Sequence, residues 1–159
     1  MTHPHHDHLA GLVEVLRRYR VERVLSPPLE YESPVYDEWL RLIREEGIEH
    51  TVAHAGQQVA LGEGVVMKVL SPRTELLVGS KSDLDNNSVV LRLSAGDVSF
   101  LFTGDVMRET EWELVRRRAD LHSTVLKVGH HGSDTSTTPG FLAVVSPQAA
   151  VISCAGGLV

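Results

Sequence analysis

Cysteine and long apolar runs are both scarce in this sequence. Its 159 residues contain a single cysteine, Cys154, so no disulfide can form within the chain. No apolar stretch approaches the ~20 residues that a helix needs to cross a bilayer, and no segment has the pattern of a signal peptide. The sequence therefore predicts a globular domain without internal disulfides, and any membrane attachment is expected to lie outside these residues.

Basic residues are also outnumbered in this chain. The chain has 15 Lys and Arg residues and 21 Asp and Glu residues, which gives a formal net charge of −6. Proteins that bind nucleic acid without sequence preference normally neutralise phosphates with Lys and Arg. The excess of acidic residues therefore argues mildly against a nucleic-acid-binding surface of this kind. Basic runs occur at residues 17–20 and 116–118, late in expected helices. Because the helix dipole favours cations there, we expect both runs to form solvated faces.

Histidine, in contrast, is concentrated at one end of the chain. Four of the nine histidines lie within the first eight residues, in the pattern His3-x-His5-x-Asp7-His8. Imidazole and carboxylate groups together suit zinc, manganese or iron, and the pattern supplies two pairs of them. A histidine run after an initiator methionine can also be an affinity tag, but a proline and an aspartate interrupt this one. A two-metal hydrolase is therefore the first hypothesis.

Apolar residues at helical spacing begin directly after the histidine cluster and predict a helix over residues 9–19. The cluster is thus expected at the N-terminus of a helix. Ser33 and Pro34 have the residue types of an N-cap and a first helical position, and Gly47 that of a helix stop, so a second helix is expected between them. Further helices are expected over residues 107–118 and 139–145.

Strand patterns alternate with these helices. A polar loop over residues 73–87 interrupts them, and residues 95–97 have the turn chemistry of a hairpin. Helices and strands follow one another without repeats or linkers, so we expect one α/β unit of layered sheets and helices. The segments expected as strands are 21–25, 48–53, 59–61, 65–70, 88–93, 98–103, 124–128 and 149–153, the last of them buried.

Two further motifs lie at the ends of expected strands. One is Phe-Thr-Gly-Asp over residues 102–105, and the other is Gly-His-His-Gly-Ser over residues 129–133. Together with the histidine cluster, they make the chain resemble the metallo-β-lactamase superfamily. The segments 85–91 and 126–137 make it similar, more closely, to the C-terminal hydrolase domain of ComEC-type DNA-internalisation (competence) membrane proteins. This resemblance covers residues 2–153.

The resemblance implies a site that holds two divalent metal ions, zinc or manganese. His3 and His5 would bind the first ion, since alternate residues of an extended loop point the same way. Asp7 and His8 would bind the second ion, and Asp7 would also take part in catalysis. Asp105, which follows an apolar strand, would bridge the two ions with its two carboxylate oxygens. Two such ions lower the pKa of a water and stabilise charge that develops on a phosphoryl or acyl oxygen.

One histidine of the pair His130 and His131 would complete the second metal site, and we prefer His131 only slightly. The other, taken as His130, would act as a catalytic residue that contacts a phosphate oxygen or protonates a leaving group. The hydroxyl-rich run over residues 132–137 suits an oxyanion or a phosphate. It would equally suit a plain polar loop that leads into the next helix.

The sequence departs from the superfamily pattern in two places. Many members have a third histidine for the first metal ion before the strand that leads to Gly-Asp, but this chain has asparagine, asparagine and serine at residues 86–88. The first site is therefore expected to be one ligand short and to favour a harder ion such as manganese. Related domains also begin with several strands ahead of the histidine cluster. The expected fold is an incomplete metallo-β-lactamase-type αββα sandwich, a single partial domain over residues 1–159 that is truncated at both ends.

These features favour a metal-dependent phosphodiesterase or nuclease that acts on DNA during uptake. The domain would belong to a bacterial inner-membrane protein, with the side of the membrane and the oligomeric state left open. An enzyme that hydrolyses small esters, lactones or phosphorylcholine esters is an alternative with the same chemistry. A non-catalytic DNA-binding or gating module with a vestigial metal site is a second alternative, which the acidic composition and the missing histidine favour.

Overall fold

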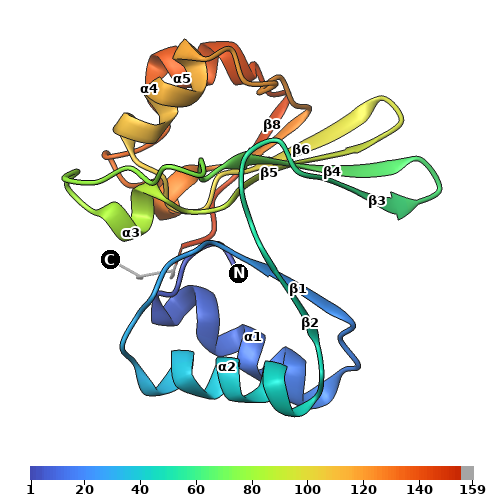
Figure 1. Ribbon diagram of the computed structural model, residues 1–159. Helices are drawn as coiled ribbons and strands as arrows, with labels where there is room; N and C mark the ends of the chain where they lie inside the picture. The colour runs from blue at the N-terminus through green and yellow to red at the C-terminus, as the bar shows by residue number, and fades with distance from the viewer. Residues whose placement is uncertain (155–159) are drawn as a thin grey trace.

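The structure is a computed structural model that describes residues 1–154, and its elements form four layers (Figure 1). Helices α1 (His6–Arg18) and α2 (Pro34–Glu45) make one outer layer. Helices α4 (Arg108–Arg116) and α5 (Pro139–Val145) make the other. Two β-sheets lie between these helical layers. The predicted helix–sheet–sheet–helix sandwich is therefore confirmed.

The two sheets differ in size and in strand direction. The smaller sheet pairs β1 (Arg23–Ser26) with β2 (Glu49–Val52) in parallel. The larger sheet has six strands in chain order, antiparallel up to β6 and parallel from β6 to β8. Because parallel neighbours need a crossover, α4 and α5 connect these last strands. The six strands are β3 (Gln58–Gly62), β4 (Val65–Ser71), β5 (Val90–Ala95), β6 (Val98–Phe102), β7 (Val125–Lys127) and β8 (Ala149–Val151).

The parallel strands β6 and β7 end at the same edge of the larger sheet. Phe102 and Lys127, the last residues of the two strands, are partners in the ladder. The segments 103–105 and 129–132, which follow them, therefore leave the sheet side by side. These segments carry the Gly-Asp and His-His motifs, so the sheet topology brings the two motifs together.

Apolar side chains fill the space between the layers in three clusters. Leu9 of α1 and Trp39 of α2 are almost completely buried and belong to the cluster between the outer helices and the smaller sheet. Leu25 of β1 packs against Val69 and Val89, which joins the two sheets. The third cluster joins the larger sheet to α4 and α5 and consists of Leu70, Val90, Leu101, Val106, Leu114, Leu121, Leu126, Phe141 and Val145.

The helix starts follow the sequence signals closely. Ser33 is the N-cap of α2, and its hydroxyl accepts a hydrogen bond from the Tyr36 amide at 3.2 Å, as the Ser-Pro signal predicts. Helix α1 begins at His6, three residues before the expected start at residue 9. Asp7 and His8 therefore lie in its first turn, where the positive end of the helix dipole favours a carboxylate.

Two expectations about secondary structure were wrong. The last strand, β8, is exposed rather than buried, and Val151 has 54% of its surface accessible. Among the described strands it lies at the edge of the sheet and pairs with β7 alone. Its apolar composition therefore wrongly indicated a buried strand. The polar segment 73–87 contains a short helix, α3 (Asp83–Asn86), which four residues are too few to reveal by periodicity. Ser82 caps this helix and accepts from the Asp85 amide.

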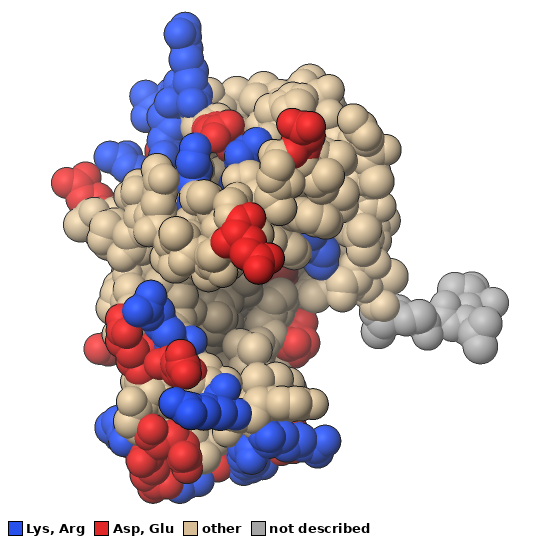
Figure 2. Space-filling model, turned by 90° about the vertical axis from the view of Figure 1, so that its right-hand side faces the viewer, with Lys and Arg blue, Asp and Glu red and all other residues tan. Residues whose placement is uncertain are grey.

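The surface over α1 and α2 is charged but balanced. Figure 2 shows acidic and basic side chains side by side over this layer, at the bottom of the view. Arg17 contacts Glu14 at 2.7 Å and Glu38 at 2.8 Å, and Arg41 also contacts Glu38. The basic run that begins at Arg17 therefore forms the solvated face that the sequence predicts, and the structure adds ion pairs to it. Within the described part of the chain, no helix combines the length and the apolar character needed to cross a membrane.

Glu111 of α4 joins the two helices of the other outer layer. Its side chain is completely buried, and its carboxylate accepts hydrogen bonds from the amides of Thr137 and Thr138, the latter at 2.8 Å. These amides lie directly before α5, where a helix leaves its first N–H groups without backbone partners. Burial raises the pKa of Glu111. This carboxylate therefore satisfies the buried start of α5.

We expect Glu111→Ala to lower the free energy of unfolding by about 2–4 kcal/mol, because two buried amides lose their acceptor. Glu113→Ala is the matched control on the same helix. Glu113 pairs with Arg117 at the surface, so its loss should cost less than about 1 kcal/mol. Denaturant unfolding followed by circular dichroism measures both variants. Equal stability of the two variants would contradict this role of Glu111.

Candidate metal centre

The first residues of the chain run between the two sheets and are tied to both. The amino group of Met1 donates to the Leu25 carbonyl of β1 at 2.8 Å. The Val89 amide, beside β5, donates to the Thr2 carbonyl at 2.9 Å. His3, the next residue, is completely buried. The start of the histidine cluster is thus anchored between the two sheets, with His3 in the core.

Three side chains form a first group of donor atoms. His3 Nε2 lies 3.0 Å from His5 Nδ1. Oδ1 of Asp85 lies 3.2 Å from the same atom of His5 and 3.6 Å from His3 Nε2. His3 and Asp85 are buried, whereas the His5 side chain is 34% exposed. Two imidazoles and one carboxylate therefore converge on one point.

Four side chains form a second group beside the first. His8 Nε2 and His131 Nε2 lie 3.0 Å apart, and Asp105 Oδ2 lies 3.3 Å from each of them. Asp7 Oδ2 is 3.2 Å from His131 Nε2 and 3.7 Å from His8 Nε2. This group combines donors from α1, from the end of β6 and from the loop after β7.

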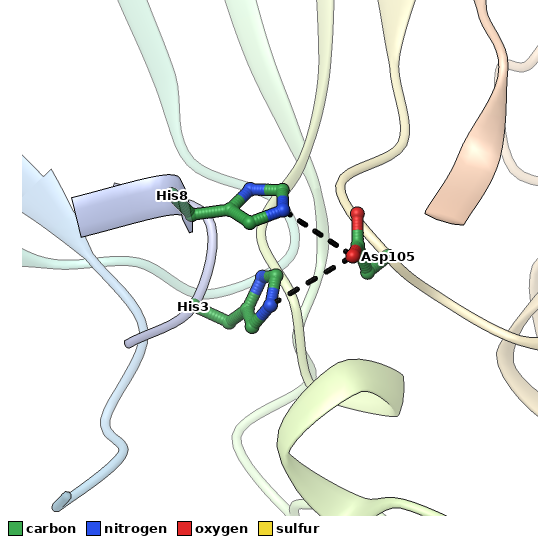
Figure 3. A group of neighbouring side chains, drawn as sticks. All are labelled: His3, His8 and Asp105. Atoms are coloured by element: carbon green, nitrogen blue, oxygen red, sulfur yellow. Dashed lines mark ion pairs between the residues drawn. The ribbon is translucent and has the colours of Figure 1, made fainter. Parts of the chain in front are cut away.

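Asp105 lies between the two groups. Its Oδ2 atom is 3.9 Å from His3 Nε2 of the first group, as well as 3.3 Å from His8 Nε2 of the second (Figure 3). Figure 3 shows both imidazoles directed at this carboxylate from the same side. A carboxylate in this position can face two ions at once.

The donor atoms fit divalent metal ions in two respects. Donors around a tetrahedral ion lie about 3.3 Å apart when the bonds are ~2.0–2.1 Å long, and the distances within each group scatter around that value. In addition, Oδ1 of Asp85 and Oδ1 of Asp105 are buried without a hydrogen-bond partner among the described residues. A buried carboxylate oxygen without a partner is costly unless a cation compensates it.

Electrostatics keep the buried groups in the forms that bind metal. Burial, reinforced by the neighbouring His8, lowers the pKa of His3 to about 3, so this imidazole is neutral at pH 7. Burial works to raise the pKa of Asp105, but the hydrogen bond with His8 and the nearby imidazoles outweigh it and lower that pKa. A neutral imidazole and an ionised carboxylate are the ligand forms that a cation requires.

Thr2 orients two of the imidazoles. Its hydroxyl oxygen lies 3.3 Å from His3 Nδ1 and 3.1 Å from His8 Nδ1. A hydroxyl oxygen can accept a hydrogen bond from both rings, which leaves Nε2 of each ring free to bind a metal ion. Thr2 is a supporting residue that the sequence analysis did not single out.

Gly104 allows Asp105 to reach this position. Its φ is +56°, and an added Cβ would lie 2.8 Å from the Ser88 Cβ and 3.2 Å from the Thr2 Cβ. The Asp105 amide donates to the Ser88 hydroxyl at 3.4 Å. The glycine of the Gly-Asp motif is therefore required by both the backbone conformation and the close approach of the segments that carry the donors.

The two adjacent histidines diverge. Both have left-handed backbone conformations, with φ of +46° at His130 and +53° at His131, and the His130 amide donates to the Gly104 carbonyl at 3.2 Å. His131 points into the second donor group. His130 Nδ1 instead contacts the Thr135 hydroxyl at 3.0 Å, and that hydroxyl contacts Ser133 at 2.9 Å. Non-glycine residues are strained in this conformation, a condition that clusters at functional sites.

Asp85 is the donor that the sequence analysis missed. A histidine was sought at residues 86–88 and the first group was expected to be one ligand short, but the preceding aspartate places its carboxylate there. The two asparagines have structural roles instead. Asn86 accepts from the Met107 amide at 3.0 Å, and Asn87 donates to the Leu77 carbonyl at 2.8 Å. The available signal in the sequence was an acidic residue directly before the two asparagines.

The sequence as a whole agrees with this geometry. Residues 1–156 match the model of the metallo-beta-lactamase superfamily, and the chain belongs to that superfamily. It is 31% identical over 153 residues to ComE operon protein 3 of Bacillus subtilis (strain 168), a match that covers 96% of the chain and 19% of that protein. It is 39% identical over 103 residues to competence protein ComA of Neisseria gonorrhoeae, over 63% of the chain and 14% of that protein. The predicted resemblances to the superfamily and to competence proteins are confirmed.

These relatives are much longer than the chain, which spans less than a fifth of the length of either one. Among solved structures, the chain is similar to CmlA, a diiron β-hydroxylase from Streptomyces venezuelae. The TM-score is 0.59 at 14% identity, over 94% of the chain and 34% of CmlA. At this identity the likeness shows a shared fold and nothing about the reaction.

We expect Gly104→Ala to lower the free energy of unfolding by about 2–4 kcal/mol, because it adds a steric overlap and a strained φ. Gly140→Ala is the matched control, since a Cβ at this helical position meets no atom within 4 Å. It should leave stability unchanged or raise it by up to about 1 kcal/mol. Thermal and denaturant unfolding of both variants tests the difference, and a Gly104→Ala chain as stable as the original would refute it.

Proposed function

We propose that this chain is a hydrolase domain that holds two divalent metal ions and cleaves phosphodiester bonds in nucleic acid. The observation that carries the proposal is the pair of adjoining donor groups that share Asp105, with two buried carboxylate oxygens that find no hydrogen-bond partner within residues 1–154. The first ion would be held by His3, His5 and Asp85. The second would be held by His8, His131 and Asp7, and Asp105 would face both ions.

The donor set favours zinc or manganese. Imidazole nitrogen suits both ions, and each additional carboxylate shifts the preference toward the harder manganese. The first group contains a carboxylate from Asp85 where many superfamily members have a third imidazole. This difference supports manganese at the first position, with Asp85 proposed as the third ligand of that ion.

The proposed centre is accessible to solvent at His5, Asp7 and His131, and most of all at Asp7. His3 and Asp105 are buried, whereas the side chains of Asp7 and His131 are 63% and 33% exposed. A substrate would therefore approach from the side of Asp7 and His131. Bound divalent ions would supply a water of lowered pKa and offset negative charge on a phosphoryl oxygen.

Two residues of the chain are proposed to take part in catalysis, one through the attacking water and one at the substrate. The carboxylate of Asp7 is placed at the opening to accept a proton from the attacking water. His130, held by Thr135, is proposed to donate a hydrogen bond to a phosphate oxygen or a proton to the leaving group. The hydroxyls of Ser133 and Thr135 lie beside it and are further donors for an oxyanion.

Nucleic acid is proposed as the substrate because of the relatives. The chain is similar to proteins named for competence and recombination, and the family resemblance implies DNA that is cut during uptake. We extend the proposal to a domain of a larger bacterial membrane protein, since the chain matches only 19% of ComE operon protein 3. Fold likeness alone would be weak support for any substrate.

The metal content of the purified chain tests the donor assignment. After loading with Mn²⁺ or Zn²⁺ and desalting, elemental analysis should find two ions per chain. Asp85→Asn should retain fewer ions than the original, and Asp105→Ala should lose both, since its carboxylate faces both groups. The matched control is Asp134→Asn, an exposed aspartate on the loop after His131. A chain without bound ions, or an Asp85→Asn variant with an unchanged metal content, would overturn the assignment.

Activity tests the reaction class. With Mn²⁺ or Zn²⁺, the chain should hydrolyse bis-p-nitrophenyl phosphate and nick single- or double-stranded DNA. Asp7→Asn should lower kcat about a hundredfold or more, the usual contribution of a positioned acid or base. His6→Asn, an exposed neighbour on the same helix, should leave it unchanged. Turnover of a lactone or ester with intact DNA would point to the small-ester alternative, and no turnover of any substrate to the non-catalytic one.

A further inference from the structure

A second concave surface lies on the layer of α4 and α5, apart from the donor groups. It is a cleft of about 810 Å³, lined along α4 by Arg108, Trp112 and Arg116 and closed by Arg73 and Phe141. Figure 1 shows these two helices on the outer side of the larger sheet. None of the seven proposed metal donors lines this cleft, so the reaction proposed above leaves it without a role.

Trp112 is the most unusual residue of the cleft. Its side chain is 65% exposed, although tryptophan is the residue type with the largest apolar surface. The guanidinium of Arg116 lies 5.2 Å from the centre of its ring. An exposed indole with an arginine over one face is a platform on which a flat aromatic group can stack.

Arginines and glutamates line the cleft in equal number, but they differ in their partners. Three glutamates line it, but each is already engaged: Glu111 holds the amides before α5, Glu109 accepts from Asn86, and Glu113 pairs with Arg117. Arg108 and Arg116, in contrast, have no acidic partner within 4.0 Å in the part of the chain that the structure describes. The cleft therefore presents two guanidinium groups without a salt bridge among the described residues, four residues before and four residues after Trp112 on the same helix.

Arg108 also connects this cleft to the metal centre. Its amide donates to the Thr135 carbonyl at 3.0 Å, and its guanidinium donates to the Asp134 carbonyl at 3.3 Å. Both acceptors belong to the loop that begins with His130 and His131. A ligand on α4 and a ligand at the metal centre would thus lie on opposite sides of one short loop.

We propose that this cleft binds a segment of single-stranded nucleic acid, with one base stacked on Trp112 and phosphates beside Arg108 and Arg116. An aromatic face combined with arginines is the chemistry that binds unpaired bases without sequence preference. An apolar peptide would use the indole but not the guanidinium groups, and duplex DNA would offer no free base face. This inference rests on the proposed function, because nucleic acid is taken from it as the substrate. The new element is a second place, outside the metal centre, where the strand is bound.

Binding of labelled oligo(dT), measured by fluorescence anisotropy in EDTA, tests the cleft without any need for hydrolysis. Trp112→Ala should weaken binding about tenfold, because stacking of a base on an aromatic side chain contributes that much or more. Arg116→Gln should lower the slope of log K against log[salt] by about 0.7, the value for one phosphate contact to a single strand. Both variants should hydrolyse bis-p-nitrophenyl phosphate at the original rate.

Intrinsic fluorescence gives a direct reading of the stacked base. Trp39 is 1% exposed, so quenching of tryptophan fluorescence by unlabelled oligo(dT) should come from Trp112. The quenching should disappear in Trp112→Phe. This variant keeps an aromatic ring for stacking and should still bind oligo(dT). Tyr19→Ala is the matched control, since Tyr19 is 68% exposed and precedes an exposed arginine on another face. Its affinity for oligo(dT) should equal that of the original chain.

Two outcomes would overturn the proposed cleft. One is unchanged oligo(dT) binding by Trp112→Ala, and the other is equal quenching by inorganic polyphosphate, which carries charge but no base. Neither result would affect hydrolysis at the metal centre. Weakened binding by Trp112→Ala in a chain that cleaves no phosphodiester would support the cleft and refute the proposed reaction, so the two proposals can fail separately.

Discussion

The carboxylate of Asp105, buried between two groups of imidazoles, is the constraint on which the rest of the site depends. It can reach this position only because Gly104 lets the chain turn with a positive φ against Ser88 and Thr2. Thr2 is in turn bonded to the segment before β5, and His131 approaches from the loop after the neighbouring parallel strand. Segments that are far apart in the sequence thus meet at one atom, Oδ2 of Asp105.

This arrangement costs free energy that the fold itself does not offset. Two carboxylate oxygens are buried without hydrogen-bond partners among the described residues, and two consecutive histidines hold left-handed conformations. Unpaired buried carboxylates and such backbone conformations each cost free energy of order one to several kcal/mol. Cations between the donors would offset much of this cost, so metal binding and folding are expected to be coupled. The same physical argument therefore links the stability of the sandwich to the chemistry proposed for it.

The sequence predicted the elements with strong local signals, and it failed where the signal lay in the tertiary structure. Ser33 and Pro34 marked a helix start correctly, and the Gly-Asp and His-His motifs were correctly placed at strand ends. Nothing local, however, showed that Ala149–Val151 forms an exposed edge strand, because burial there depends on which strands lie beside it. Asp85 was missed for a similar reason: it lies in a helix of four residues, and only the fold brings its carboxylate to His3 and His5.

A carboxylate from Asp85 in the proposed first donor group has a consequence for long-range attraction. An imidazole ligand is neutral, so a carboxylate in its place would lower the net charge of a metal-loaded centre by one. Such a centre would retain its ions more firmly, but its field would attract a polyanion less strongly. In a chain with a formal net charge of −6, capture of an incoming strand would then depend on guanidinium groups outside the centre, such as those of Arg108 and Arg116 in the proposed cleft.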